Sequence, residues 1–110
     1  IKAYLRHEPY EVVEAENGAQ ALSRVQAERF DVVLMDVQMP VMDGYAATRA
    51  IREWETAMRR PRTPIIALTA NAIKEDMERS LAAGCDDHLT KPIKKRVLLD
   101  ALRERLAAAA

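Results

Sequence analysis

The chain has few of the side chains from which redox and metal centres are built. Its 110 residues include a single cysteine, Cys85, and two histidines, His7 and His88. One cysteine excludes an internal disulfide, and one thiol with two imidazoles does not supply a thiolate or imidazole metal cluster. This cysteine usage favours a reducing, cytoplasmic setting.

Long apolar runs and an excess of either charge are also missing. No stretch approaches the roughly 20 apolar residues that span a bilayer, and no signal-peptide pattern opens the chain. The 17 basic and 17 acidic residues give a formal net charge of zero. This balance argues against binding of nucleic acid or of a membrane surface by this domain. The length and the apolar content of 49% predict one globular domain over residues 1–110.

The strands are the clearest elements that the sequence does contain. Four apolar residues between Asp31 and Asp36, followed by Met39-Pro40, predict a strand over residues 31–36 that is buried on both faces. Residues 64–68 predict a second buried strand, which ends at Thr69. Val12 and Val13 between glutamates indicate an edge strand over residues 11–15, and residues 87–90 are compatible with a short last strand.

Helical spacing separates these strands. We expect Asn17-Gly18 to turn the chain, and Ala83-Gly84 to end the third helix. The predicted apolar stripes are Ala19, Leu22 and Val25; Ala47, Ile51, Trp54 and Met58; Ile73, Met77 and Leu81; and Val97, Leu98, Ala101, Leu102 and Leu106. Alternating strands and helices predict right-handed β-α-β units, with a parallel sheet covered by helices on both faces.

Three polar residues follow predicted strands: Asp36, Thr69 and Lys91. The carboxyl ends of parallel strands share one edge, where open α/β sheets bind ligands, so these side chains can converge. A carboxylate, a hydroxyl and an ammonium suit phosphoryl transfer, with the carboxylate as nucleophile. Taken singly, each has a plainer interpretation: Asp36 as a turn residue, Thr69 as a helix cap and Lys91 as a surface charge.

Three segments in order carry a family resemblance: LMDVQMPVMDG at residues 34–44, PIIALTANA at 64–72 and GCDDHLTKP at 84–92. Over essentially its whole length the chain resembles the receiver domain of two-component response regulators, most of all receivers of hybrid sensor histidine kinases. The resemblance implies a flavodoxin-like, doubly wound α/β fold with five parallel strands in the order 2-1-3-4-5. That order agrees with an edge strand at residues 11–15.

The resemblance also implies roles for individual residues. Asp36 would be the phosphoacceptor, phosphorylated by the phosphohistidine of a histidine kinase or of a histidine phosphotransfer domain. Lys91 would pair with the phosphoaspartate, and the Thr69 hydroxyl would move to hydrogen-bond it, which biases a conformational equilibrium. Asp36 and the backbone carbonyl of Gln38 would be ligands of Mg²⁺. The Lys91-Pro92 peptide would be cis.

Two nearby residues have competing interpretations. Asp43 precedes a predicted helix, so capping is favoured over a role as a second catalytic acid. His88 stands where the family usually carries Tyr or Phe, whose ring moves with the Thr69-equivalent hydroxyl. Histidine is smaller and ionises near neutral pH, so either an active switch or a surface histidine without such a role fits.

One expected element does not occur in the sequence. The family's first strand ends in two acidic residues that hold Mg²⁺, and the chain starts at Ile1 within the expected first helix. Mg²⁺ needs about six oxygen ligands, so Asp36 alone is a weak site. We therefore expect further residues before Ile1 in the natural protein, or, as the alternative, a strand exchanged with a second copy. A homodimer through the last two strands and helices is a further option.

The predicted function is that of a phosphoacceptor module in a phosphorelay, which transfers a phosphoryl group onto its own Asp36 and slowly hydrolyses it without being a turnover enzyme. One alternative is a degenerate receiver that binds proteins independently of phosphorylation. The other is a small phosphohydrolase, which would need a second acid such as Asp43 to protonate the leaving group.

Overall fold

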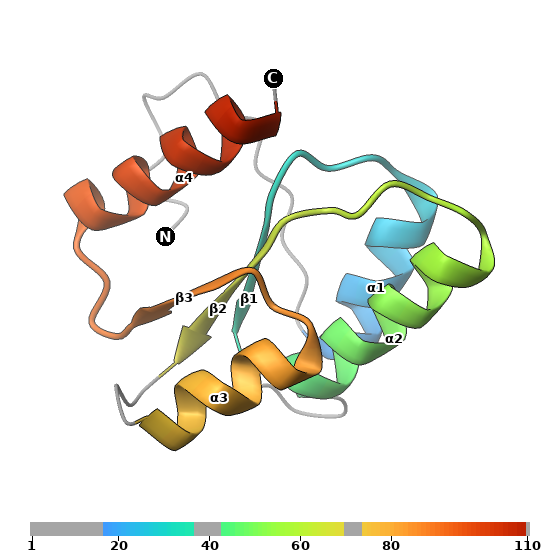
Figure 1. The fold of residues 1–110 in the computed structure, drawn as a ribbon, viewed down its shortest axis with the longest axis horizontal. Coiled ribbons are helices and arrows are strands. Elements are labelled where there is room, and N and C mark those ends of the chain that lie inside the picture. Colours follow the sequence, from blue (N-terminus) through green and yellow to red (C-terminus); the bar gives the residue numbers. More distant parts are fainter. Residues whose placement is uncertain (1–16, 37–42, 70–73, 110) are drawn as a thin grey trace.

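The computed structural model describes residues 17–36, 43–69 and 74–109, and the structural statements below concern these residues. Helices and strands alternate along the chain (Figure 1). The strands are β1 (Val33–Asp36), β2 (Ile65–Thr69) and β3 (Asp87–Thr90), and the helices are α1 (Gly18–Ala27), α2 (Gly44–Ala57), α3 (Lys74–Ala83) and α4 (Lys95–Ala109).

The strands form a parallel sheet in the order β1-β2-β3, which confirms the last three strands of the predicted arrangement. All five residues of β2 are buried, as predicted for a central strand. The prediction for residues 31–36 is partly wrong, because the strand starts at Val33 and only Met35 is fully buried. β1 lies at the margin of the described sheet, where its side chains have fewer neighbours. The predicted strand at residues 11–15 lies outside the described residues.

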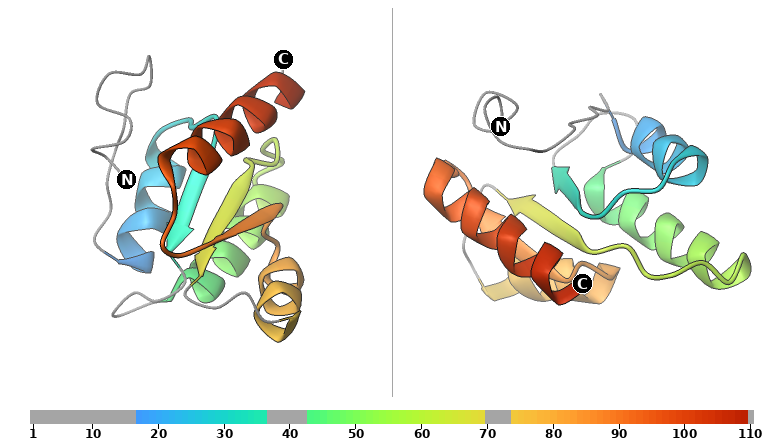
Figure 2. Two further views of the ribbon diagram at one scale, coloured as in Figure 1. Left: turned by 90° about the vertical axis from the view of Figure 1, so that its left-hand side faces the viewer. Right: turned by 90° about the horizontal axis from the view of Figure 1, so that it is seen from above.

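Helices cover both faces of the sheet, as predicted (Figures 1 and 2). On one face, Met35, Ile65 and Ala67 pack against Val25 of α1 and Ile51 of α2. On the other face of the sheet, leucines of α4 pack against a smaller apolar set from the strands and the residues next to them: Val32, Leu34, Leu89 and Ile93. Successive strand side chains point to opposite faces, so one apolar run supplies both clusters.

Polar side chains begin α1 and α2. The Asn17 side chain accepts a hydrogen bond from the Gln20 amide at 2.9 Å, so Asn17 caps α1 and the predicted Asn17-Gly18 turn is wrong. The Asp43 side chain accepts from the Ala46 amide at 2.8 Å, which confirms the predicted cap of α2. Asn is favoured both in turns and at helix N-caps. Here the helical spacing of the apolar residues that follow favours the N-cap.

Three predicted stripe residues are exposed instead of buried, namely Met58 (58%), Leu81 (60%) and Val97 (47%). Met58 lies just beyond the end of α2. Of the α3 residues whose burial is described, 77–83, Ser80 and Ala83 are buried, so the helix is rotated by about one residue from the predicted stripe. In α4, Leu98, Leu99 and Leu102 fill the interface and Val97 lies beside it.

Candidate functional site

Asp36 and Lys91 form an ion pair at the carboxyl edge of the sheet. Lys91 Nζ lies 2.6 Å from Asp36 Oδ2, and the two side chains are 39% and 35% exposed. Asp36 ends β1 and Lys91 follows β3, so the pair reaches across the end of β2. The structure thus brings together two residues 55 positions apart in the sequence, as strand order predicted.

Thr69 ends the strand between them. In the register of the sheet, Asp36 is opposite Leu68 and Thr69 is opposite Thr90, so Thr69 lies one position further toward the carboxyl edge than the residue opposite Asp36. The Thr69 carbonyl accepts a 2.7 Å hydrogen bond from the Lys91 amide, and the residue is 2% exposed. The predicted trio therefore ends three adjacent strands at one edge.

The structure describes some of the other predicted residues but not all of them. His88 lies on β3 with a half-buried side chain, and its amide donates to the Asp87 carboxylate at 2.8 Å. The Lys91-Pro92 peptide is cis, as the family resemblance implied. Gln38 lies outside the described residues. Asp43 is engaged at the start of α2, where its carboxylate caps the helix.

Of the two predicted Mg²⁺ ligands, Asp36 and Gln38, only Asp36 lies among the described residues. Asp36 is a hard carboxylate donor of the type Mg²⁺ prefers, but Mg²⁺ needs about six oxygens around it. Among the residues that the structure describes, no group of three or more histidines, cysteines or acids could hold a metal ion. Asp36 is therefore a suitable Mg²⁺ ligand, but the described residues do not provide a complete set of ligands.

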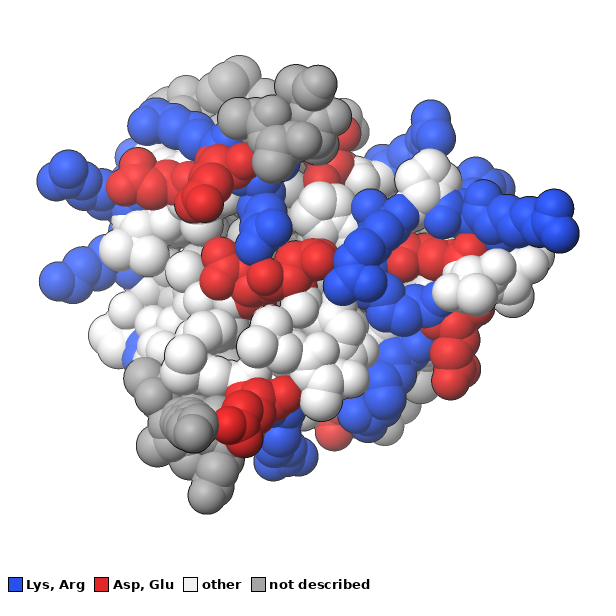
Figure 3. Space-filling model, viewed as in Figure 1, with Lys and Arg blue, Asp and Glu red and all other residues white. Residues whose placement is uncertain are grey.

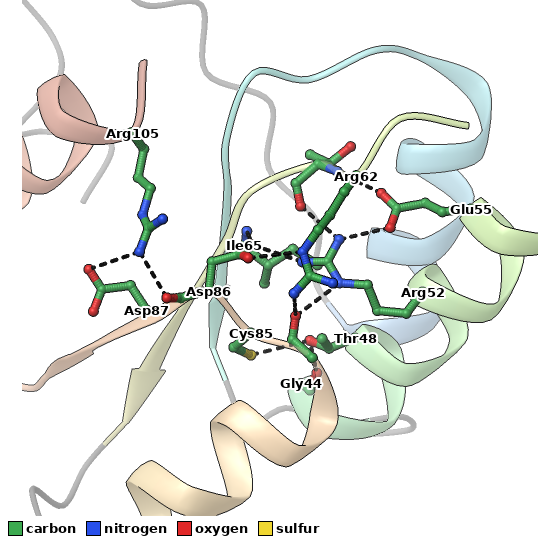
Figure 4. Close-up of polar contacts among 12 residues, drawn as sticks. Gly44, Thr48, Arg52, Glu55, Arg62, Ile65, Cys85, Asp86, Asp87 and Arg105 are labelled. Carbon is green, nitrogen blue, oxygen red and sulfur yellow. Dashed lines mark hydrogen bonds and ion pairs between the residues drawn. The ribbon is translucent and has the colours of Figure 1, made fainter. Parts of the chain in front are cut away.

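A second polar cluster lies at the opposite, amino-terminal end of the strands (Figure 4). Arg52 of α2 donates to Glu55 at 2.8 Å, to the Thr63 carbonyl at 2.8 Å and to Asp86 at 2.9 Å. Asp86 also accepts from Arg62 at 3.0 Å and from the Ile65 amide at 2.9 Å. The cluster ties α2 and the loop after it to the starts of β2 and β3.

Asp86 is the acidic centre of this cluster. Its burial alone would raise the carboxyl pKa, but the hydrogen bonds from the Ile65 amide and Arg62, with the charges of Arg52 and Arg62, lower the pKa below its ordinary value. Sequence reasoning missed the cluster. The signal in the sequence was a loop with three arginines at residues 59–63 and an acidic pair, Asp86-Asp87, of opposite charge.

The single cysteine is buried beside α2. Its Sγ lies 3.7 Å from the Thr48 hydroxyl, and burial raises the pKa of the Cys85 thiol above its ordinary value. A buried, protonated thiol is a poor nucleophile, so Cys85 acts as a packing residue.

The structure is an open α/β domain with a carboxylate, an ammonium and a hydroxyl at the carboxyl ends of its strands. Residues 1–103 match the model of the response regulator receiver domain family, and the chain therefore belongs to that family. Among curated relatives, the sensor protein GacS of Pseudomonas syringae is 53% identical over 88 residues, which are 80% of this chain and 10% of the relative. The chain thus spans about a tenth of the length of that relative.

Solved receiver structures have the same fold. The receiver domain of the sensor histidine kinase PA1611 of Pseudomonas aeruginosa, which has a magnesium ion in its active-site cleft, is 43% identical, with a TM-score of 0.85 over 96% of this chain and 84% of that one. The Saccharomyces cerevisiae complex of the histidine phosphotransfer protein Ypd1 with the receiver of Ssk1 aligns with a TM-score of 0.92 at 29% identity, covering 99% and 80% of the two chains. These likenesses confirm the flavodoxin-like receiver fold and the predicted resemblance to sensor-kinase receivers.

No helix of the described residues is both long enough and apolar enough to cross a membrane.

Proposed function

We propose that this receiver domain accepts a phosphoryl group on Asp36 and switches conformation in response. The observation that carries the proposal is the 2.6 Å contact between Lys91 Nζ and Asp36 Oδ2 at the edge where β2 ends in Thr69. Of the described carboxylates, Asp36 alone ends a strand at this edge and has a cation in contact with it. Asp43, the next acid after Asp36 in the sequence, caps α2, which argues against a role for it as the second acid of a phosphohydrolase.

The donor in this proposal is a phosphohistidine on a histidine kinase or a phosphotransfer domain. A carboxylate oxygen of Asp36 attacks phosphorus, a P–O bond forms, and the P–N bond to imidazole breaks with its electron pair leaving on nitrogen. Negative charge is spread over three phosphoryl oxygens, which the Lys91 ammonium stabilises. Water later attacks the acyl phosphate, so the module hydrolyses its own phosphate slowly and is not a turnover enzyme.

Thr69 and His88 form the switch of the proposal. A hydrogen bond from the Thr69 hydroxyl to the phosphoryl group exists only in the phosphorylated state, so it shifts the equilibrium between two conformations. His88 lies on the adjacent strand β3, three residues before Lys91. Its ring would report that shift on the surface formed by β3 and the helices around it.

Mg²⁺ is the proposed cofactor. Asp36 and the backbone carbonyl of Gln38 would hold it, with further oxygens supplied by the phosphoryl group and water. When bound, the ion supplies positive charge that neutralises the phosphoryl oxygens. The magnesium ion in the cleft of the PA1611 receiver supports this assignment.

The proposed setting is the cytoplasm, within a longer protein such as a hybrid histidine kinase. The proposed partners are a histidine kinase or a phosphotransfer domain, which the Ypd1–Ssk1 complex supports. We propose no contact of this domain with nucleic acid or membrane, in line with its zero net charge. A homodimer through the last two strands and helices, or through strand exchange, stays a further option.

The test is phosphorylation by a small donor. The protein, with any residues that precede Ile1 in its gene, is incubated with phosphoramidate and Mg²⁺, and the intact mass is measured. We expect one acid-labile phosphoryl adduct on the wild-type chain and none on Asp36→Asn. Asp43→Asn is the matched control, because it changes a neighbouring carboxylate to an amide that still caps a helix, and it should keep the adduct.

Each other outcome decides against the proposal. The absence of an adduct on the wild-type chain would favour a phosphorylation-independent interaction module. Continuous release of phosphate without a lasting adduct would favour the phosphohydrolase. Retention of the adduct in Asp36→Asn would move the phosphoacceptor to another residue.

A further inference from the structure

The residues that follow α2 form an exposed surface, Met58, Arg59 and Arg60, which we call the α2 tip. Met58 is 58% exposed, and both arginine side chains are exposed. Neither arginine forms an ion pair or a side-chain hydrogen bond with a residue that the structure describes. Arg60 lies over the Trp54 ring at 5.7 Å from its centroid. Figure 3 shows basic side chains projecting on the side of the molecule where α2 ends.

The backbone of Arg59 is left-handed, with φ at 53°. The Arg60 amide donates to the Glu55 carbonyl at 2.8 Å, and the Arg59 amide donates to the Thr56 carbonyl at 3.3 Å. This pair of bonds is the Schellman motif, whose left-handed residue is usually Gly. An equivalent pair of bonds ends α3, and there the left-handed residue is Gly84, with φ at 109°. Arginine is strained in this conformation, so folding of the α2 end favours glycine at position 59.

The loop after the α2 tip is anchored to the rest of the domain (Figure 4). Arg62 donates to Asp86 at 3.0 Å, and the Thr63 amide donates to the Glu55 carboxylate at 2.7 Å. Between these anchors and the helix, Pro61 has a fixed φ. The α2 tip is therefore held from both sides, and a partner that binds it has little conformational entropy to overcome.

The composition of the α2 tip indicates the class of its partner. Arginine and tryptophan contribute most of the energy at protein interfaces, and methionine is enriched there. Nucleic acid is disfavoured, because its binding depends on many phosphate contacts and the chain has a net charge of zero. The uncompensated charges of Arg59 and Arg60 favour carboxylates, and the exposed Met58 favours an apolar side chain beside them.

We propose that Met58, Arg59 and Arg60 are a docking site for an acidic segment of a partner protein. Carboxylates of the segment pair with the two arginines, and an apolar side chain of the segment covers Met58. The α2 tip precedes β2 and so lies at the amino end of the sheet, whereas Asp36 lies at the carboxyl edge. A partner bound to the α2 tip leaves Asp36 accessible, so the inference holds independently of the proposed function. The surface is small, as in transient complexes.

The experiment uses three short labelled peptides as probes, which repeat Glu-Glu-Leu, Lys-Lys-Leu and Glu-Glu-Ser. Fluorescence anisotropy gives the Kd of each peptide at low and at high salt. The receivers are the wild type, the double variant Arg59→Gln, Arg60→Gln, the single variant Met58→Ser, and the control Arg96→Gln, Arg103→Gln. The control removes two exposed arginines of α4, which covers the other face of the sheet from α2.

We expect the wild type to bind the Glu-Glu-Leu peptide at least about tenfold more tightly than either of the other peptides. The advantage over Lys-Lys-Leu should shrink as salt is raised. The double variant should lose the preference over Lys-Lys-Leu, Met58→Ser should lose the preference over Glu-Glu-Ser, and the control should keep both. Equal affinities for the three peptides, loss of preference in the control, or tighter binding of a DNA duplex at the same salt would overturn the proposal.

Arg59→Gly separates docking from folding. Glycine removes the backbone strain, so the melting temperature should rise by about 4 °C, while the affinity for Glu-Glu-Leu should fall at least about threefold. A lower melting temperature would assign Arg59 a folding role and contradict the proposal. Phosphoramidate should phosphorylate Asp36 at the same rate with and without the bound peptide. Slower phosphorylation with the peptide would place the peptide at the carboxyl edge and also contradict it.

Discussion

Lys91 Nζ contacts Asp36 Oδ2 at 2.6 Å across the end of β2, joining the outer strands of the described sheet. A backbone hydrogen bond helps to position this contact, because the Lys91 amide donates to the Thr69 carbonyl and holds the lysine backbone just after the end of β3. Replacing Lys91 should therefore affect chemistry more than folding.

Lys91→Ala should slow phosphorylation of Asp36 by phosphoramidate about a hundredfold, the usual effect of removing one group that stabilises transition-state charge. Lys91→Arg keeps the charge but not the compact ammonium, so an intermediate rate is expected. Stopped-flow fluorescence or quenched mass measurement gives the rates. An unchanged rate in Lys91→Ala would remove the lysine from the mechanism.

Asp43→Ala should lower the free energy of unfolding by about 1 kcal/mol, because the Ala46 amide loses its capping partner. Asn17→Ala, at the start of α1, should cost a similar amount. Both proteins should still be phosphorylated on Asp36. Denaturant unfolding supplies the energies, and loss of phosphorylation in Asp43→Ala alone would restore a catalytic role for this acid.

Asp86→Asn should lower the free energy of unfolding by about 2 kcal/mol, because Arg52, whose side chain is only 13% exposed, loses one of its two charged acceptors and keeps Glu55. The neighbouring Asp87→Asn is the matched control. Its carboxylate is more exposed and its partner Arg105 is 3.7 Å away, so a much smaller cost is expected. Equal losses in the two variants would show that the cluster in Figure 4 does not depend on Asp86.

Acid should destabilise the wild type partly through the same residue. The native pKa of Asp86 is lowered, so below the ordinary aspartate pKa of about 3.9 the unfolded chain binds more protons than the native one. The contribution of Asp86 is therefore complete above that pH and is lost as the pH falls through the native pKa. Unfolding energies measured between about pH 6 and about pH 3 should fall less steeply in Asp86→Asn. Parallel curves would contradict this.

His88→Tyr should leave phosphorylation of Asp36 intact, because the imidazole lies on β3 and not in the Asp36–Lys91 contact. The larger ring should change how phosphorylation alters the surface of β3 and α4. Amide chemical shifts with and without phosphoramidate report both effects. Loss of phosphorylation would place His88 in the chemistry, and identical shift changes in both proteins would leave it without a switching role.

Particular elements show how far the sequence alone could go. Strand β3 was predicted at residues 87–90 and is found there. The buried run before Thr69 and the Asp43 cap were also confirmed. For β2 the local property that decides the structure is an apolar run, and for the start of α2 it is a side-chain oxygen that accepts a hydrogen bond from a free backbone amide. The exposed Leu81 and Val97 were not predictable, because the rotation of a helix about its axis depends on which neighbour it meets.

The sequence by itself determined the chemistry available at the carboxyl edge: one carboxylate, one hydroxyl and one ammonium, each after a strand. Only the tertiary structure decided that Lys91 and Asp36 are in contact, since the parallel order of β1, β2 and β3 brings their ends to one edge. It alone also showed that Asp86 is enclosed by two arginines at the other end, and that Arg59 and Arg60 have no acidic partner among the described residues. Charge balance in a sequence counts residues, whereas compensation depends on distances that only the packed strands and helices set.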